Sequence, residues 1–181
     1  RLWDPAKNLA ALDEIAPQLA WPVRVAGSCV HPDSGESVAA RNVTMLGSLS
    51  QPQVARELSD AAIYALPARY EPFGLSILEA ALSGCALVVG DIPSLRELWD
   101  GVAWFVAPDS PDALTDALQR LIDDEPLRAA SAEAALARAR TFTPESTARA
   151  YARVYHEVIE ARRSDTLVPA GVGAQLQELP L

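Results

Sequence analysis

Residues 63–90 read IYALPARYEPFGLSILEAALSGCALVVG. Apolar runs at 63–66 and 86–89 have the length of buried strands, and residues 75–82 between them place apolar side chains at helical spacing. A strand, a helix and a second strand in this order form the unit that joins two parallel strands, because parallel strands need a crossover connection. The segment therefore predicts an α/β fold built on a parallel sheet.

Strands and helices continue to alternate on both sides of this unit. Residues 28–41 are polar and rich in turn residues, which predicts a loop. The other elements expected from periodicity are strands at 23–26, 43–46 and 102–106 and helices at 8–19, 53–59, 95–99 and 111–123. Short apolar strands between amphipathic helices predict a Rossmann-like, doubly wound parallel sheet with helices on both of its faces.

Both ends of the chain depart from this alternation. Two extra C-terminal helices, 127–139 and 144–162, follow the last strand without another strand between them. Beyond them the periodicity is lost, so we expect one domain over residues 1–163 and a flexible tail over residues 164–181. A helix follows Arg1 almost at once, where a doubly wound domain should begin with a strand, and we expect the first strand to be truncated. Either a natural split subunit or a truncated fragment fits this beginning.

Charge and hydropathy argue against two classes of partner. The chain has 24 acidic and 15 basic residues and a formal net charge of −9, which argues against nucleic acid, because a phosphate backbone is bound by a cationic surface. No apolar run approaches the roughly 20 residues that a transmembrane segment needs. The sequence also shows no charged-then-apolar signal segment, so we expect a cytoplasmic protein.

The sequence contains no pattern of metal ligands. Cys29 and Cys85 lie far apart, His31 and His156 are isolated, and no Asp-x-Asp triplet occurs. We therefore expect no metal and no other cofactor. Any bound anion must be held by a local arrangement of side chains and backbone N–H groups.

Residues 69–80 are the most informative about function. They run from the end of a strand into a helix, which is where ligands bind in open α/β sheets. Gly74 allows a ligand to approach the backbone, and the free N–H groups of Leu75 and Ser76 would point at an anion held at the positive end of the helix dipole. A phosphate group fits this position without a cluster of basic residues.

Two carboxylates bracket this phosphate position. Glu79 shares its helical face with Leu75, Leu78 and Leu82, which predicts that it lies on a buried apolar stripe, where a carboxylate is costly unless it is paired. It forms a structural salt bridge, lies at a wet edge of the stripe, or recognises hydroxyl groups of a ligand. Glu71, eight residues earlier, is either a solvated loop acid or a second part of the same site.

Residues 71–79, with a Phe-Gly pair between the two glutamates, resemble the Glu-x7-Glu motif of the family four glycosyltransferases, which have the GT-B fold of two Rossmann-like domains. Arg1 and Lys7 resemble an arginine and a lysine that this family carries six positions apart. The further segments that fall in the family's order are 25–27, 43–47, 83–88 and 97–101. The resemblance spans about residues 1–160. It implies that the chain is the C-terminal, donor-binding half of a retaining hexosyltransferase.

The resemblance assigns the diphosphate of a nucleoside-diphosphate sugar to a definite set of groups. Arg1 and Lys7 would bind it, and the backbone from Phe73 to Ser76 would cradle its distal part. Breaking the anomeric C–O bond leaves a growing negative charge on this diphosphate. Fixed cations and helix N–H groups stabilise that charge more in the transition state than in the ground state.

The remaining roles that the resemblance implies concern the nucleoside and the sugar. Glu79 would accept hydrogen bonds from the ribose hydroxyls, Glu71 would hold hydroxyls of the transferred sugar, and the base would stack near Gly27 and Met45. One segment departs from the family: residues 91–94 read Asp-Ile-Pro-Ser where two glycines are common. We expect a stiffer loop there and a different sugar specificity.

The resemblance further implies transfer without a metal and with retention, by attack on the face of the leaving phosphate and without an enzyme nucleophile. The acceptor would be held by an N-terminal GT-B domain that is missing from this chain, so this fragment alone would bind the donor but not turn it over. The final helix would lie towards the junction with that domain. No transmembrane segment is expected, and peripheral membrane association of the whole enzyme is compatible with this reading.

Two alternatives stay open from the sequence. A GT-B sugar-nucleotide epimerase shares the architecture and the nucleotide site, and a non-catalytic module would use the same site to bind a nucleotide-sugar. A dehydrogenase is disfavoured, because no Gly-x-Gly-x-x-Gly turn follows a strand. The base, the sugar, the acceptor and the oligomeric state are not encoded in any motif.

Overall fold

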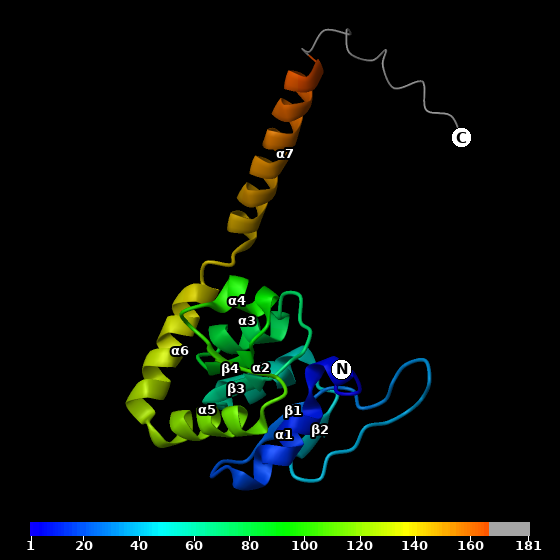
Figure 1. The fold of residues 1–181 in the computed structure, drawn as a ribbon, viewed down its shortest axis with the longest axis vertical. Coiled ribbons are helices and arrows are strands. Elements are labelled where there is room, and N and C mark those ends of the chain that lie inside the picture. Colours follow the sequence, from blue (N-terminus) through cyan, green and yellow to red (C-terminus); the bar gives the residue numbers. More distant parts are fainter. Residues whose placement is uncertain (167–181) are drawn as a thin grey trace, which may run out of the picture. The chain divides into compact units, whose positions relative to one another are not determined.

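The computed structural model describes residues 1–166, and the chain divides into two compact units (Figure 1). Within the described residues, the unit Arg1–Arg140 holds every strand, and the unit that begins at Thr141 holds the helix α7 (Pro144–Thr166). The site residues expected from the sequence all belong to the first unit.

The first unit alternates strands and helices as the sequence predicts. Its strands are β1 (Arg24–Ala26), β2 (Thr44–Gly47), β3 (Ile63–Leu66), β4 (Ala86–Gly90) and β5 (Trp104–Val106). Its helices are α1 (Leu9–Ile15), α2 (Gln51–Asp60), α3 (Leu75–Leu82), α4 (Pro93–Trp99), α5 (Pro111–Asp123) and α6 (Glu125–Ala139), with 3-10 turns at Pro5–Lys7 and Ala16–Gln18. The predicted bounds of β3, α3 and α5 are confirmed residue for residue.

One predicted helix is shorter than expected. The periodicity from residue 8 to 19 predicts a single helix, but α1 ends at Ile15 and a 3-10 turn follows it. Pro17 lies in the first turn of that 3-10 segment and has no N–H to donate to an earlier carbonyl. The α-helical hydrogen-bond pattern therefore stops there, although the apolar spacing continues.

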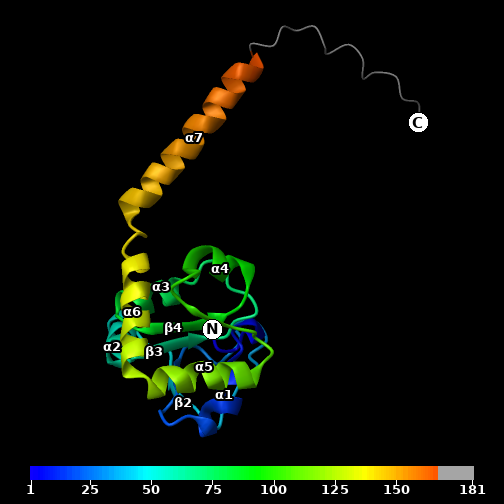
Figure 2. The ribbon, with the colours of Figure 1, turned by 60° about the vertical axis from the view of Figure 1, so that its left-hand side comes forward.

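The strands form two parallel ladders rather than one. β3, β4 and β5 form a three-stranded sheet in the order β3-β4-β5, while β1 pairs with β2 alone. The parallel α/β class is confirmed, and helices lie on both sides of β3 and β4 (Figure 2). The sequence predicted a doubly wound parallel sheet with a truncated first strand, and within the described residues no strand joins β1 to β3.

The core is centred on β4, whose residues are all buried. Ala86 and Val88 belong to an apolar cluster with Leu12 of α1 and Leu114 of α5. Because successive side chains of a strand point to opposite faces, Leu87 points the other way, to the face that α3 and α4 cover (Figure 2). β4 is therefore covered on both faces, as a nearly continuous apolar strand of a parallel sheet must be.

Gly90 ends β4 at a point of very close backbone contact. A Cβ atom at this position would lie 2.1 Å from the carbonyl oxygen of Ala68, in the segment that follows β3. Backbone cannot move aside as the end of a side chain can, so the close approach requires glycine. This contact fixes the loop after β3, which carries the site, against the neighbouring strand.

The second unit is built on α7, which runs further than the sequence predicts. The helix was expected to end near residue 162, and the structure continues it to Thr166. Thr143 and Ser146 cap its start reciprocally, since each backbone N–H donates to the other's side-chain oxygen, at 3.0 and 3.1 Å. The predicted tail beyond Thr166 lies outside the described residues. No helix of the described part is long and apolar enough to cross a bilayer.

Candidate functional site

The N-terminal segment lies along the loop that follows β3. The backbone N–H of Arg69 donates to the carbonyl oxygen of Ala6 at 2.9 Å, and Lys7 Nζ donates to the carbonyl oxygen of Tyr70 at 3.2 Å. Residues from the start of the chain therefore meet residues some sixty positions away, at the carboxyl end of a parallel strand. Ligands of open α/β sheets bind at this end of the strands.

Lys7 and Glu71 form the charged centre of this junction. Lys7 Nζ lies 2.8 Å from Glu71 Oε2, and only 15% and 16% of the two side chains are exposed. The backbone N–H of Gly74 donates to Glu71 Oε1 at 3.0 Å. Burial raises the pKa of Glu71, but the Lys7 ammonium and the N–H groups of Gly74 and Phe73 outweigh it, so the pKa is lowered overall. The reading of Glu71 as a solvated loop acid is wrong.

Gly74 begins α3 in a conformation that favours glycine. Its φ is 81°, and a Cβ there would lie 2.6 Å from Ile77 Cδ1. The first N–H groups of a helix have no partner within it, so those of Leu75 and Ser76 are the groups that α3 presents to a ligand. The anion predicted from the sequence would bind at this start of α3.

A partly buried hydrogen bond holds the first turn of α3 on the sheet. Tyr64, on β3, donates its hydroxyl to Ser76 Oγ at 2.8 Å. Burial raises the pKa of Tyr64 to about 12. The phenol therefore stays protonated, and it remains a donor to Ser76 across the neutral pH range.

Glu79 does not lie on a buried stripe. Leu75 is 69% exposed and Leu82 is 50% exposed, and Glu79 itself is exposed, whereas Ile77 and Ala80 are fully buried. The stripe prediction is wrong because α3 packs through its small and β-branched residues rather than through its leucines. Among residues 1–166, no hydrogen-bond or ion-pair partner is recorded for the Glu79 carboxylate, so the salt-bridge alternative is also wrong.

Arg1 lies at the carboxyl end of β1. The backbone N–H of Leu2 donates to the carbonyl oxygen of Ser28 at 2.8 Å, and a Cβ on Gly27 would lie 3.3 Å from Arg1 N. The Arg1 guanidinium is exposed and lies 6.0 Å from the ring centroid of Trp3, which packs edge-on against His31 at 4.4 Å. The N-terminal segment therefore packs against Gly27, directly after the carboxyl end of β1.

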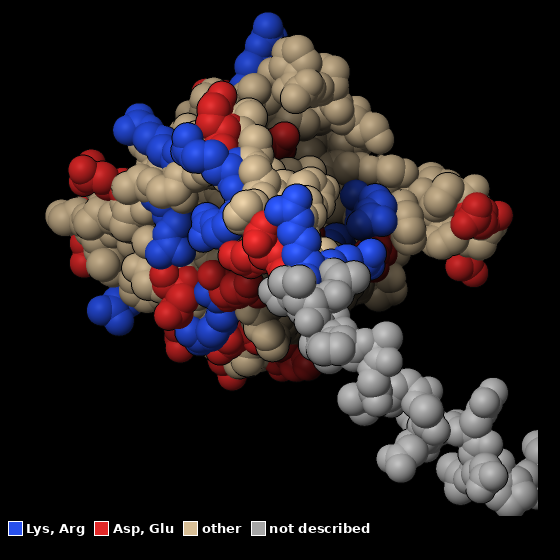
Figure 3. All heavy atoms as spheres, turned by 90° about the horizontal axis from the view of Figure 1, so that it is seen from above, with Lys and Arg blue, Asp and Glu red and all other residues tan. Residues whose placement is uncertain are grey.

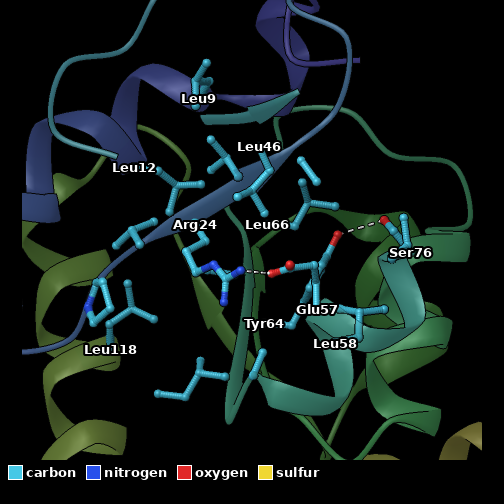
Figure 4. A pocket seen from close by; sticks show the side chains of 18 of the residues that line it. Leu9, Leu12, Arg24, Leu46, Glu57, Leu58, Tyr64, Leu66, Ser76 and Leu118 are labelled. Atoms are coloured by element: carbon cyan, nitrogen blue, oxygen red, sulfur yellow. Dashed lines mark hydrogen bonds and ion pairs between the residues drawn. The ribbon is translucent and has the colours of Figure 1, made fainter. Parts of the chain in front are cut away.

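A cavity of about 770 Å³ connects these groups (Figure 4). Of the residues predicted from the sequence, Arg1, Lys7, Glu71, Ser76 and Glu79 line it. The other predicted positions, Gly27, Met45, Phe73, Gly74 and Leu75, lie outside its lining. Met45 packs against the core cluster, and its neighbour Leu46 lines the cavity instead. The structure thus brings the predicted cations and both carboxylates together, but not the predicted base-stacking pair.

Asn8 is a structural centre that sequence reasoning missed. It is 2% exposed, has a φ of 60°, and its Nδ2 donates to the carbonyl oxygens of Pro67 at 2.9 Å and Pro108 at 2.8 Å. Arg69 donates to Asn8 Oδ1 at 2.6 Å. The amide thereby ties the N-terminal segment to the ends of β3 and β5. Its only local signal is that asparagine tolerates a positive φ between two helical turns.

Ser94 lies in the segment 91–94 that departs from the family, but no role of its own was predicted for it. Its hydroxyl donates to the carbonyl oxygen of Glu71 at 2.6 Å and so fixes the backbone that carries the buried carboxylate. Arg96 donates to both carboxylate oxygens of Asp91, at 2.6 and 2.8 Å, across the loop expected to be stiff. A pair of glycines could supply neither interaction.

Figure 3 shows Lys and Arg side chains intermixed with Asp and Glu side chains on the face that it draws. Within the described residues, no group of three or more His, Cys, Asp or Glu side chains is arranged to hold a metal ion. Arg1, Lys7 and Arg24 are the basic residues that line the cavity.

Comparison with known proteins identifies the family of this chain. A family model described as "Glycosyl transferases group 1" matches residues 1–124. The lipopolysaccharide core biosynthesis mannosyltransferase LpsB of Rhizobium meliloti is 35% identical over 102 residues, which cover 54% of this chain and 29% of that enzyme. The chain spans about a third of the length of the curated relatives that it matches.

Solved structures share the fold. Sucrose-phosphate synthase from Thermosynechococcus elongatus superposes with a TM-score of 0.75 at 22% identity, over 88% of this chain and 44% of that one. Anabaena HepE, solved in complex with UDP and glucose, superposes with a TM-score of 0.72 at 19% identity, over 85% of this chain and 46% of that one.

Proposed function

Since the chain belongs to the group 1 glycosyl transferases, we propose that it binds a nucleoside-diphosphate sugar and forms the donor half of a hexosyltransferase. The observation that carries this proposal is the buried Lys7–Glu71 pair beside the N-terminus of α3, in the cavity that Arg1 and Glu79 also line. A cation and a carboxylate next to free helix N–H groups match a ligand with an anionic part and a hydroxylated part.

The diphosphate lies between Arg1, Lys7 and the first turn of α3 in this proposal. When the glycosidic bond to the phosphate breaks, negative charge grows on the diphosphate, and these groups stabilise it. The Lys7 ammonium has three N–H donors. It gives two of them to Glu71 and Tyr70. The third remains for a phosphate oxygen.

In this proposal the two carboxylates bind hydroxyl groups of two different parts of the ligand. Glu71 accepts hydrogen bonds from Lys7 and from the backbone N–H groups of Gly74 and Phe73, and a carboxylate has about four acceptor positions. The acceptor position that remains binds a hydroxyl of the sugar. Glu79 carries an exposed carboxylate on the same cavity and accepts the ribose hydroxyls.

We also propose the finer assignment to family four, with retention of configuration and without a metal. The Glu-x7-Glu spacing places one carboxylate before α3 and the other on it, which supports distinct roles for the two. Arg1, Lys7 and the helix terminus take the part that a bound cation plays in other transferases. The acceptor site and the turnover belong to an N-terminal GT-B domain outside this chain.

Calorimetric titration with UDP, GDP and ADP and their glucose and mannose conjugates tests the proposal. We expect one nucleotide series to bind, with the same Kd in the presence of EDTA. Lys7→Ala should weaken that binding by about tenfold or more, because it removes the buried cation. Arg56→Ala, which removes an exposed cation outside the cavity lining, is the matched control and should leave the Kd unchanged.

Two results would contradict the proposal. If no series binds to the chain, the donor site is absent. If EDTA abolishes binding, a metal rather than Lys7 and Arg1 holds the diphosphate, and the assignment of the cations fails.

A further inference from the structure

We propose that Tyr64 is a positioning residue of the candidate donor site: by donating its hydroxyl to Ser76 Oγ, it leaves the Ser76 O–H free to donate to a phosphate oxygen of the ligand. The inference rests on the proposed function and adds a side-chain donor to it, because the other donors at the start of α3 are backbone N–H groups. Tyr64 itself would not touch the ligand. It would act through Ser76.

Tyr64 lies on the side of β3 that α3 covers. Its neighbours Ile63 and Ala65 pack against the core cluster on the side of α1 and α5, and successive side chains of a strand point to opposite faces. The phenol therefore reaches the first turn of α3, where its oxygen lies 2.8 Å from Ser76 Oγ (Figure 4). Both residues line the cavity that Lys7 also lines. The hydrogen bond between them is thus part of the wall of the candidate site.

The proton of the Ser76 hydroxyl has no acceptor within residues 1–166. A hydroxyl has one O–H donor, and a serine in a helix commonly gives it to the carbonyl oxygen three or four residues earlier. Ser83, which follows α3, donates in this way to the carbonyl oxygen of Glu79 at 2.9 Å. The side-chain hydrogen bond of Ser76 is instead the one that it accepts from Tyr64. Its O–H therefore remains available to a ligand in the cavity.

The surroundings of Tyr64 favour this direction of the bond. Burial and the negative charges of Glu71 and Glu79 raise the pKa of Tyr64 to about 12, so the phenol keeps its proton at neutral pH. Ser76 Oγ is the acceptor recorded for that proton among the described residues. If the bond were reversed, the phenol proton would lose its acceptor, which costs free energy at a partly buried position.

The start of α3 then presents three donors on one turn, namely the N–H groups of Leu75 and Ser76 and the O–H of Ser76. A hydroxyl that accepts one hydrogen bond becomes a stronger donor, because neighbouring hydrogen bonds polarise each other. Hydrogen bonds to a charged oxygen are also shorter and stronger than those between neutral groups. A phosphate group, which carries several acceptor oxygens, fits this set of donors.

Four variants of the full chain test the inference: Tyr64→Phe, Ser76→Ala, Ser76→Thr, and the double variant that combines Tyr64→Phe with Ser76→Ala. Tyr151→Phe, which removes an exposed phenol hydroxyl from α7, is the matched control and should change no Kd. Calorimetry gives the Kd of inorganic pyrophosphate and of the nucleoside diphosphate that binds, with UDP tried first. Amide hydrogen exchange of α3 is measured without ligand, because it reports whether the helix itself is loosened.

We expect Ser76→Ala to weaken the binding of both ligands by about tenfold, and Tyr64→Phe by about threefold, since the Ser76 hydroxyl then remains but is no longer oriented. The double variant should bind no more weakly than Ser76→Ala alone. Ser76→Thr keeps the hydroxyl and should stay within about twofold of the parent chain. The α3 amides of Tyr64→Phe should exchange within about twofold of the parent rates.

An unchanged Kd in Tyr64→Phe would overturn the inference. Weaker binding accompanied by faster exchange of the α3 amides would also overturn it, because the bond would then only hold the helix in place. A loss in the double variant beyond that of Ser76→Ala would show that Tyr64 acts through another group, with the same consequence.

The donor proposal can fail separately. If pyrophosphate binds with these ratios and no nucleotide does, Tyr64 and Ser76 serve an anion site and the inference stands without that function. If neither ligand binds, both the inference and the donor proposal fail.

Discussion

Lys7 Nζ and Glu71 Oε2 lie 2.8 Å apart, and both side chains are largely buried. The folded-state pKa of Glu71 is lowered, so its ionisation stabilises the fold above the unfolded-state pKa of about 4.3, and this contribution is lost as the pH falls through the lowered value. Glu71→Gln should therefore reduce the free energy of unfolding at pH 7 by about 1–2 kcal/mol, between the values for exposed and fully buried ion pairs.

Urea denaturation at pH 7 and at pH 3 measures this difference, which should shrink at the lower pH. Glu57→Gln, which breaks the more exposed pair with Arg24, is the control and should cost less. A Glu71→Gln deficit of the same size at both pH values would show that the carboxylate's charge does not stabilise the fold.

Substitution of Glu79 should change ligand affinity in a different way from substitution of Glu71. If it accepts ribose hydroxyls, Glu79→Ala should weaken the binding of a nucleoside diphosphate and of its sugar conjugate equally, by about tenfold. Glu71→Ala should instead remove most of the extra affinity that the sugar adds. Both variants are titrated with UDP and UDP-glucose, or with the nucleoside diphosphate and sugar conjugate of whichever base binds, to separate the two roles. Equal small losses from both variants would remove the two assignments.

At the scale of elements, the end of β4 is in close backbone contact with the segment after β3. Gly90→Ala would place a methyl group 2.1 Å from the carbonyl oxygen of Ala68, so we expect a loss of about 3 kcal/mol in the free energy of unfolding, at the upper end of overpacking effects. Gly35→Ala is the control. Its Cβ meets nothing within 4 Å, and its positive φ should cost about 1 kcal/mol. Equal midpoints of urea denaturation for the two variants would contradict the backbone contact.

Element positions were predictable from the sequence where local signals agree. β3, α3 and α5 were placed correctly because apolar spacing, Gly74 and Pro111 mark the same boundaries. The burial of α3 was not predictable. Its leucines have the spacing of a core face, yet the buried residues are Ile77, Ala80 and Ala81, and the two alanines let the helix approach its neighbours closely.

The candidate site shows the same division between local and long-range information. The position of Glu71 before a helix start was readable, whereas its ion pair with Lys7 joins residues 64 positions apart and depends on the whole chain path. Asn8 and Ser94 act through contacts of this long-range kind, and no local pattern reveals these contacts. The gap between β1 and β3 likewise depends on strand order, which apolar periodicity does not report.

At the scale of the molecule, the division into two units predicts that the first unit unfolds and binds nucleotide independently of the second. Residues 1–140 contain the whole described core and every residue of the candidate site, and α7 belongs to the second unit. A chain that ends at Arg140 should therefore unfold cooperatively and bind the nucleotide with an unchanged Kd. Circular dichroism melting and calorimetry test this expectation. Loss of cooperative unfolding would show that the first unit needs the second.

α7 also carries an exposed apolar stripe, formed by Tyr151, Val154, Tyr155, Val158 and Ile159, each at least half exposed. Such stripes promote association. The shortened chain should therefore remain monomeric at concentrations at which the full chain associates, as sedimentation velocity would show. Association of both chains to the same degree would assign the contact to the first unit.

The edge-on pair of Trp3 and His31 beside Arg1 has an optical consequence. An indole ring between an imidazole and a guanidinium emits light whose intensity depends on the distance and charge of both neighbours. A diphosphate that draws the Arg1 side chain toward Lys7 would change one of those neighbours without any added label. The intrinsic fluorescence of Trp3 should therefore follow the occupancy of the site in real time.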